Sequence, residues 1–324
     1  MSNIAVIGAG MAGLTAARTL KDNDLQVTIF EKSRGPGGRM ATQRIDGLQF
    51  DKGAQYFTVK DPRFENFVNP LIQQDMVKEW KLRLGVCIEG KLVARESSIK
   101  RYVGVPRMTS LTRYISEDLD IRYQTRIAAI NENDNLWFLT DSDENHYGPF
   151  THVILTLPPS QTMDLIYPYR SSFREIENIE LAPCWAVMVS FEKSIKIPYD
   201  GIFFNGHPIS WASRDSSKPQ RPKGYTWVLH GSHEWSEKYF NRDNKWIERE
   251  LIRSFLEAVG ERKKIIESFS HRWRYSRAMI NVDIGSIFNR DINLAIAGDW
   301  LHGSRIEGAY LSGLELAESI LKMK

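Results

Sequence analysis

Residues 4–13, with the sequence IAVIGAGMAG, decide the fold that we predict for this chain of 324 residues. The run at 4–7 is short, apolar and rich in β-branched residues, which is typical of a buried strand. Three glycines follow at the spacing GxGxxG, and an amphipathic helix pattern then begins at Leu14. A second strand is expected at 26–30 and ends at Glu31. Together these elements form a complete dinucleotide-binding unit.

Each residue of this motif has its own physical reason. Gly8 allows a tight turn, Gly10 lets the backbone approach a pyrophosphate, and Gly13 lets the helix and the strand pack closely. The helix N-terminus supplies N–H donors and a positive potential for the phosphates. Glu31 would accept hydrogen bonds from the adenosine ribose. The complete unit favours a bound dinucleotide over the alternative, a glycine turn without a ligand.

The composition fits a packed globular protein of about two domains, with 42% hydrophobic and 26% charged residues. The net charge of +3 lacks the clustered basic excess of a nucleic-acid binder, although it is compatible with a local phosphate site. Cys87 and Cys184 lie far apart and form no zinc or disulfide pattern, which favours a reduced, cytoplasmic compartment. The chain shows no basic leader and no run of about 18 apolar residues, so we expect no membrane partner. The missing zinc spacing leads us to expect no metal site.

The segment 34–39, RGPGGR, follows directly on the dinucleotide unit. It resembles the Glu-x(n)-Gly-Gly-Arg extension of the FAD-binding amine-oxidase superfamily, which NAD dehydrogenases normally lack. The resemblance implies FAD, with Arg39 near its phosphates. It also implies that a strand at 121–128, which overlaps the strand that we expect from the sequence at 122–130, passes the adenine at Ile127. Thr156 would then begin the turn that leads back to a substrate domain.

The C-terminal part contains two further segments that indicate a cofactor site. A strand at 294–297 leads into Gly298 and Asp299, and residues 305–309 open a helix that runs through 321. An Asp at such a corner can bond a polyol hydroxyl, and a helix N-terminus can direct N–H groups at the flavin's pyrimidine carbonyls. Both segments resemble the superfamily's GD motif and flavin-facing helix. We expect non-covalent FAD, because no Cys or His stands where monoamine-oxidase-type enzymes attach flavin; His302 is interpreted as a solvated loop residue.

The segment 50–58, FDKGAQYFT, narrows the resemblance to the renalase family, particularly its bacterial members. Further matches lie at 61–64, 102–108, 182–186, 227–230, 271–275, 298–300 and 307–309. Arg107 departs from the family pattern, which has Gly there, and Tyr102 stands where many relatives have Trp. The resemblance implies that the turn at 53–56 lies against the isoalloxazine ring. It also implies an oxidase of the 2- and 6-dihydro isomers of NAD(P), with O2 reduced to H2O2.

Such a reaction needs little catalytic apparatus. The lone pair of the ring nitrogen drives hydride loss as aromaticity returns. The protein must therefore orient the nicotinamide ring against flavin N5 and exclude water from the reacting rings. Two other functions stay open: an FAD amine oxidase with a Lys near N5, and a flavin-binding protein without turnover. The expected partners are a small dinucleotide substrate and O2, and the oligomeric state is left open.

Two interleaved domains are predicted. An α/β Rossmann-like FAD-binding domain takes residues 1–75, 101–160 and 276–324. An α+β substrate domain with a mixed, mainly antiparallel sheet takes 76–100 and 161–275, with strands expected at 183–191, 201–205, 209–214, 225–232 and 266–275 and a helix at 245–259. The polar, proline-bearing stretch at 214–224 is expected to form a mobile edge.

The motif and the resemblances together predict these cofactor contacts: Gly8, Gly10, Met11, Ala12, Gly13, Glu31, Lys32, Gly38, Arg39, Met40, Ala54, Gln55, Tyr56, Ile127, Thr156, Gly298, Asp299, Ile306, Glu307 and Ala309. The candidates for the substrate pocket are Tyr56, Arg95, Trp185, Trp211, His230, Trp273, Arg305 and Ile306. Weaker candidates are Trp227, Arg274 and Tyr275. For the aromatic residues in strands, core packing is the alternative role. No catalytic acid or base is predicted.

Overall fold

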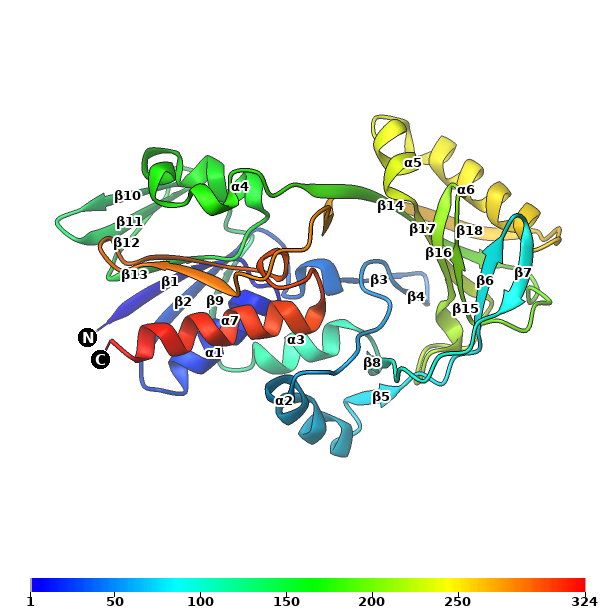
Figure 1. The fold of residues 1–324 in the computed structure, drawn as a ribbon, viewed down its shortest axis with the longest axis horizontal. Coiled ribbons are helices and arrows are strands. Elements are labelled where there is room, and N and C mark those ends of the chain that lie inside the picture. The colour runs from blue at the N-terminus through cyan, green and yellow to red at the C-terminus, as the bar shows by residue number, and fades with distance from the viewer. Residues whose placement is uncertain (1, 324) are drawn as a thin grey trace.

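The computed structural model describes residues 2–323, so the domain ends predicted at 1 and 324 lie outside the described residues. The chain forms two parts that lie side by side, and both termini belong to the first part (Figure 1). The long strand β14 (Leu181–Phe191) leads from the first part into the second (Figure 1). Over residues 2–323, no helix is both long and apolar enough to cross a lipid bilayer.

The first part is built on a six-stranded sheet of order β19-β20-β13-β1-β2-β9. Its strands are β1 (Asn3–Ile7), β2 (Gln26–Glu31), β9 (Asp120–Tyr123), β13 (His152–Leu155), β19 (Ser286–Asn289) and β20 (Leu294–Ala297). Strand β1 pairs in parallel with both β2 and β13, and only the edge strand β19 runs antiparallel to its neighbour. This is the parallel arrangement that places a ligand site at the carboxyl ends of the strands.

Side chains alternate across this sheet, so each face buries its own core. Ile4 and Val6 pack with helices α1 (Met11–Lys21) and α7 (Ile306–Leu321). Ala5 and Ile7 pack with a second, three-stranded sheet on the other face. The remaining elements of the first part are α2 (Pro62–Gln73), α3 (Thr109–Ile115), β10 (Ile127–Asn133), β11 (Leu136–Asp141), β12 (His146–Phe150), α4 (Pro159–Leu165), η2 (Tyr167–Ser172), η3 (Arg174–Ile176) and η5 (Asp299–Leu301).

The second part is a seven-stranded sheet of order β18-β14-β17-β16-β15-β6-β7. Besides β14, its strands are β6 (Leu84–Ile88), β7 (Lys91–Ala94), β15 (Gly201–Phe204), β16 (Ile209–Arg214), β17 (Thr226–Gly231) and β18 (Ile265–Ala278). All neighbours are antiparallel except β15 and β6. Helices α5 (His233–Lys238) and α6 (Asn244–Ala258) cover one face (Figure 1).

The other face of this sheet meets the first part. Short elements fill the junction: η1 (Gly38–Met40), β3 (Thr42–Ile45), β4 (Leu48–Asp51), β5 (Val77–Glu79), β8 (Tyr102–Gly104) and η4 (Asp215–Ser217). Phe50 of β4, for example, packs with Met188 and Val228 of the sheet. The predicted fold class, a Rossmann-like domain with a mixed, mainly antiparallel substrate domain, is confirmed.

Several local expectations differ from the structure. The single strand expected at 122–130 is two strands in different sheets, because Gln124 adopts a φ of 54° and turns the chain between β9 and β10. The predicted boundary at 161 moves to the start of β14, because Ile166, Phe173 and Ile176 pack in the core of the first part. Residues 76–83 also pack mainly with the first part, through Val77 and Trp80.

The stretch at 214–224 also differs from what we expect. It forms a buried junction rather than a mobile edge, because Asp215, Lys218 and Arg221 each lie almost wholly inside the protein.

Candidate functional site

The glycine turn between β1 and α1 is tightly packed at two glycines and open at the third. A Cβ atom at Gly8, whose φ is +110°, would lie 2.7 Å from Thr156 Oγ1, and one at Gly13 would lie 2.1 Å from Gly8 O. Thr156 Oγ1 itself donates to the carbonyl oxygens of Ile7 and Gly8. A Cβ at Gly10 would meet no atom within 4 Å.

Helix α1 begins directly after Gly10, and no side chain caps it. The first N–H groups of a helix have no partner within the helix, so those of α1, including Met11 and Ala12, are available to a ligand. The open space at Gly10 therefore lies where the helix presents its donors, which is the arrangement that binds a pyrophosphate.

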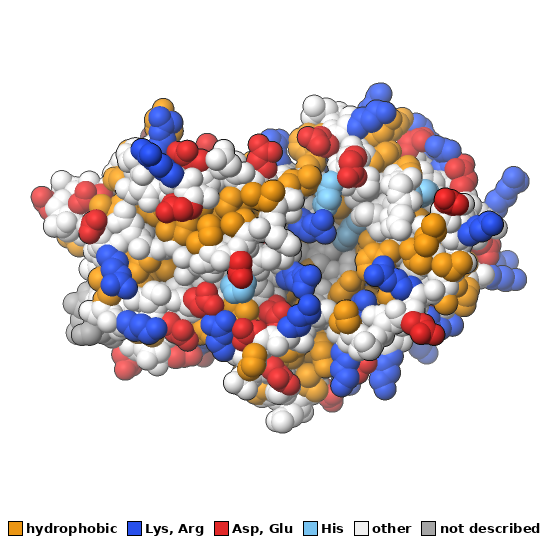
Figure 2. Space-filling view, viewed as in Figure 1, with side chains coloured by type: hydrophobic (Ala, Val, Ile, Leu, Met, Phe, Trp, Pro, Cys, Tyr) orange, Lys and Arg blue, Asp and Glu red, His pale blue; other side chains and the backbone are white. Residues whose placement is uncertain are grey.

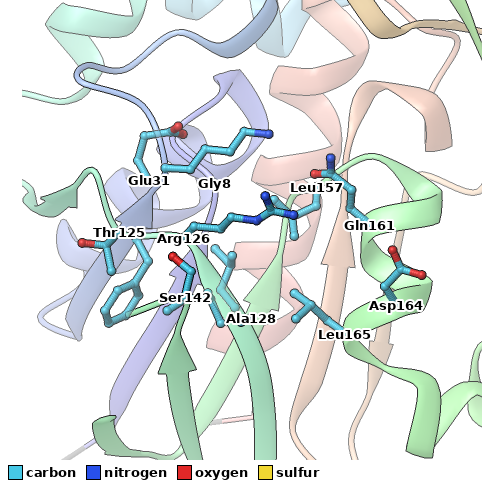
Figure 3. A pocket seen from close by; sticks show the side chains of 14 residues that line it. Gly8, Glu31, Thr125, Arg126, Ala128, Ser142, Leu157, Gln161, Asp164 and Leu165 are labelled. Atoms are coloured by element: carbon cyan, nitrogen blue, oxygen red, sulfur yellow. The ribbon is translucent and has the colours of Figure 1, made fainter. Parts of the chain in front are cut away.

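A cavity of about 300 Å³ lies beside the turn, with Lys32 among its lining residues, and is bounded by Gly8 and Glu31 on one side (Figure 3). The Glu31 carboxylate accepts the N–H groups of Ala9 (2.9 Å) and Ser33 (2.7 Å), so it is fixed at the cavity edge. The segment 125–128, which includes Ile127, forms the opposite wall, and the Arg126 side chain extends across the cavity towards the side of Leu157 and Gln161 (Figure 3). The cavity suits a flat base and its ribose.

The glycine-rich segment that follows β2 returns to the turn. Gly37 N donates to Ala9 O (2.9 Å), and a Cβ at Gly38, whose φ is +51°, would lie 3.6 Å from Gly10 Cα. This contact places η1 beside the open space at Gly10. Met40, by contrast, is buried in the core of the first part, so its side chain does not face the site.

Arg39 and Asp299 form a bidentate ion pair next to this point. Arg39 Nη2 lies 2.5 Å from Asp299 Oδ1, Nη1 lies 3.1 Å from Oδ2, and Nη1 also donates to Ser276 O. The Asp299 side chain is 9% exposed and that of Arg39 is 34% exposed, so the guanidinium keeps a face towards solvent. Gly298 N donates to Ser312 of α7, which ties this corner to the last helix.

The turn at 53–56 is fixed by contacts with the backbone of Arg39 and with the protein interior. Ala54 N donates to Arg39 O (2.9 Å), and a Cβ at Gly53 would lie 2.0 Å from the same oxygen. The Gln55 amide is buried and faces the interior, where it donates to Gly53 O and accepts from Ser213 Oγ (2.6 Å). Tyr56 is half-buried, and its ring centroid lies 5.7 Å from that of Trp211. The backbone of Gly53 and Ala54, rather than the Gln55 side chain, is therefore the surface available to a cofactor.

Helix α7 starts at the same place. Arg305 is its N-cap residue and no side chain caps it, so the N–H groups from Ile306 to Gly308 are available. The N–H of Ala309 already donates to Arg305 O (2.9 Å). Glu307 is buried and its Oε1 accepts Lys60 N (2.6 Å) and Asp61 N (2.8 Å). The Glu307 carboxylate therefore fixes the loop after the turn, and only its backbone could reach a cofactor.

Four residues contact one another where the turn at 53–56 meets the sheet of the second part, and we call them the cleft wall: Lys52, His230, His271 and Trp273. Trp273 Nε1 donates to Lys52 O (3.0 Å), and His230 Nε2 donates to the same oxygen (3.2 Å). The His271 and Trp273 rings meet edge to face, with centroids 4.3 Å apart. Burial lowers the pKa of His230 and of His271 to about 4, so both imidazoles are neutral at pH 7. Figure 2 shows a hollow between the two parts of the molecule, with His and Lys or Arg side chains at its margin.

Several predicted pocket residues do not join this wall. Trp185 lies in the core between the sheet and α6, where its Nε1 donates to Tyr239 O, and Trp227 packs against Phe255 in the same core. Arg95 lies over the Phe203 ring at the end of β7, and Arg274 over Phe240. The expectation that Trp185 faces the substrate is corrected by strand register: Cys184 pairs with Trp273, so the next residue on β14 points to the opposite face.

The buried ion network, which we define as Asp51, Asp215, Lys218 and Arg221, was not predicted from the sequence. Lys218 Nζ lies 2.6 Å from Asp215 Oδ1 and 3.3 Å from Asp51 Oδ2, and Arg221 Nη2 lies 2.6 Å from Asp51 Oδ2. All four side chains are at most 1% exposed. Lys218 Nζ also donates to Gln55 Oε1 (3.1 Å), which connects the network to the turn.

The charges of this network determine its protonation. Burial opposes ionisation of Asp51, but the charges of Lys218 and Arg221 outweigh it and lower the Asp51 pKa. Burial raises the pKa of Asp215, whose Oδ2 has no hydrogen-bond partner within the described structure. The only sequence signal was four charged residues, RDSSKPQR, directly after a buried strand.

Two models of known protein families match this chain. A model described as "NAD(P)-binding Rossmann-like domain" matches residues 6–71, and one described as "Flavin containing amine oxidoreductase" matches residues 93–321. A 4,4'-diapophytoene desaturase of Staphylococcus haemolyticus is 43% identical over 76 residues, which cover 20% of this chain and 15% of the desaturase. Protoporphyrinogen oxidase 2 of Arabidopsis thaliana is 38% identical over 68 residues, which cover 21% of this chain and 13% of that enzyme. The chain thus matches less than a sixth of either relative.

Two solved structures share the whole fold. A putative protoporphyrinogen oxidase from Exiguobacterium sp. 255-15 has a TM-score of 0.81 at 13% identity, covering 100% of this chain and 99% of that one. A triple mutant of putrescine oxidase has a TM-score of 0.78 at 12% identity, with the same coverage. At such identities the likeness shows the fold alone. The amine oxidoreductase model, however, covers more than half of the chain, and the chain therefore belongs to the flavin-containing amine oxidoreductase family.

Proposed function

We propose that this protein is an FAD-dependent oxidase that takes two electrons from the 2- or 6-dihydro isomers of NAD(P) and passes them to O2. The overall reaction consumes the dihydronicotinamide, O2 and one proton, and yields NAD(P)+ and H2O2. The substrate is the one implied by the resemblance of the turn at 53–56 and its flanks to the renalase family.

The family implies a flavin, and the residues of the site fit FAD. The open space at Gly10 meets the uncapped start of α1, and the cavity beside Glu31 has room for a nucleoside. Glu31 would hold the adenosine ribose, while α1 and Arg39 would hold the phosphates. Asp299 would meet the polyol, and the backbone at 53–54 and the start of α7 would meet the ring system. When bound, FAD supplies an acceptor for hydride at N5 and a reductant for O2.

The observation that carries the proposal is the chemistry of the cleft wall. Its two imidazoles have pKa values of about 4, which makes them poor proton acceptors at neutral pH. The nearby carboxylates are already engaged, Asp299 with Arg39 and Glu307 with the backbone at 60–61. A dihydronicotinamide needs no base, because recovery of ring aromaticity drives hydride loss. An aromatic wall at Trp273 can orient such a flat ring.

Oxidation of an amine is supported less well. A simple amine is protonated at pH 7 and must lose a proton before it donates hydride. Lys218, which bonds to the turn through Gln55, is fully buried and committed to Asp51 and Asp215, so it cannot position a water molecule for that step.

Anaerobic reduction tests the proposal. The FAD-loaded protein is mixed without O2 with 2- or 6-dihydro-NAD(P), with ordinary NADH, with putrescine and other amines, and with protoporphyrinogen. We expect rapid bleaching of the flavin absorbance by one or both isomers, and H2O2 on admission of air. Bleaching by amines or protoporphyrinogen but not by the isomers would contradict the proposal. Bleaching by none of them would favour a flavin-binding protein without turnover.

A further inference from the structure

We propose that the Lys52 ammonium binds an anionic group of the substrate, a phosphate or a carboxylate, at the cleft wall. The inference rests on the proposed function in that it places the substrate in the same cleft. It states which protein group binds the part of the substrate that is not oxidised, and equilibrium binding therefore tests it.

The backbone of Lys52 is rigidly placed. Its carbonyl accepts hydrogen bonds from both Trp273 (3.0 Å) and His230 (3.2 Å), which lie on different strands of the second part. The next residue is Gly53, where a Cβ would lie 3.1 Å from the Trp273 ring. Lys52 therefore stands between the turn at 53–56 and the sheet, and its side chain starts from a fixed point.

The Lys52 side chain is half-buried beside aromatic rings. Its Nζ lies 5.8 Å from the Trp273 ring centroid, and its charge contributes to lowering the pKa of His271. Burial also lowers the pKa of Lys52, and no acidic group acts in the opposite direction. The ammonium thus loses part of its hydration without an ionic partner in return.

The groups around Lys52 do not neutralise its charge. His230 and His271 are uncharged at pH 7, Asp51 is paired with Lys218 and Arg221, and the described chain places no carboxylate within ion-pair distance of Lys52 Nζ. A partly buried charge without a partner costs free energy, and an anion bound there would recover it. Because the indole of Trp273 lies beside the ammonium, the ligand that fits best carries both a flat ring and an anionic group.

The same charge selects against cations. A protonated amine in this cleft would be repelled by Lys52, whereas a nicotinamide nucleotide would bring its phosphate to it. The proposal therefore also accounts for the choice between the two substrate classes.

Equilibrium binding to the FAD-loaded protein tests the role of Lys52. Nicotinamide mononucleotide, nicotinamide riboside and nicotinate are titrated, and binding is followed by calorimetry and by the change in the flavin spectrum. In Lys52→Met we expect affinity for the mononucleotide to fall at least about tenfold, with a shallower salt dependence, whereas affinity for the riboside, a cation without a phosphate, should stay the same or rise. Lys52→Arg should keep most of the affinity. Lys263→Met is the matched control, because Lys263 is also largely buried but pairs with Glu261 after α6.

The titrations with nicotinate and with the mononucleotide distinguish a carboxylate from a phosphate at Lys52. Loss of nicotinate binding in Lys52→Met, with mononucleotide binding unchanged, would assign a carboxylate rather than a phosphate. Unchanged affinity for both anions, equal loss of riboside binding, or no binding of either anion to the unmodified protein would overturn the proposal. FAD content and far-UV circular dichroism of each variant check that the fold is kept. If the isomers fail to bleach the flavin while the Lys52 variants behave as expected, the proposed function fails and the anion site stands.

Discussion

Replacement of Lys218 by Met tests whether the buried ion network holds the two parts of the protein together. Asp51 lies at the end of β4, in the junction, whereas Lys218 and Asp215 follow the sheet strand β16. Lys218 Nζ has three partners, Asp215 at 2.6 Å, Asp51 at 3.3 Å and Gln55 at 3.1 Å. Met has nearly the same length and volume, so the substitution removes the charge with little change in packing.

The expected loss is large because both carboxylates stay buried. Removing one partner of a buried pair typically costs about 3–5 kcal/mol, against up to about 1 kcal/mol for an exposed pair. Asp51 retains Arg221, and Asp215 can take up a proton because burial already raises its pKa. We therefore expect the free energy of unfolding at pH 7 to fall by about 3 kcal/mol, the lower end of that range.

Urea unfolding with excess FAD, followed by Trp fluorescence and circular dichroism, measures this loss. The double variant Lys218→Met with Asp215→Asn should recover at least about 1 kcal/mol, because no carboxyl group at position 215 then has to be neutralised by a proton at pH 7. Lys264→Met is the control, since Lys264 forms an exposed pair with Glu192 at 3.3 Å. A loss below about 1 kcal/mol in Lys218→Met, or no recovery in the double variant, would refute the reasoning.

Three further predictions concern the cofactor site and the cleft wall. Gly13→Ala should disrupt the turn, because a Cβ there would collide with Gly8 O. Gly10→Ala should fold normally but bind FAD at least about tenfold more weakly, as measured by reconstitution of the apoprotein. Gly35→Ala, which also lies in open space, should change neither the fold nor the FAD affinity. Arg39→Ala should lower the FAD content of the purified protein through loss of the ion pair and of a phosphate partner, and undiminished FAD content would contradict that role. His271 has a pKa of about 4 in the fold and about 6.5 when unfolded, so the unfolded chain binds the proton first and stability falls as the pH drops from about 6.5 to about 4. His271→Asn should flatten that part of the pH–stability curve, and an unchanged curve would contradict the neutral, buried imidazole.

The nucleotide-binding part could be predicted because its signals are local. The glycine spacing at 8–13 and the strand patterns at 26–30 and 294–297 each depend on neighbours in sequence, and the structure places strands at Gln26–Glu31 and Leu294–Ala297. The split at Gln124 was missed, because a single residue in the left-handed region leaves no trace in an apolar pattern.

The sequence alone could not show which aromatic residues belong to the cleft wall and which lie in the core, and the reason is different. Trp185 and Trp273 lie on neighbouring strands, yet the register Cys184 to Trp273 sends them to opposite faces. A shift of one residue exchanges the faces, and periodicity alone does not fix the partner strand.

The ion network was missed because its members are distant in sequence. Asp51 and Lys218 lie 167 residues apart and meet only when the junction forms. Charged residues around a proline usually indicate a solvated loop, and only the packed structure shows that these are buried.

Anaerobic mixing of the FAD-loaded protein with 2- or 6-dihydro-NAD(P) is the decisive measurement of the proposed oxidase activity. We expect the flavin absorbance to be lost rapidly with at least one isomer, with NAD(P)+ as the product. Amines and ordinary NADH should leave the absorbance unchanged on the same timescale. Reduction of the flavin by an amine, with no reduction by either isomer, would show that the protein is not a dihydro-NAD(P) oxidase.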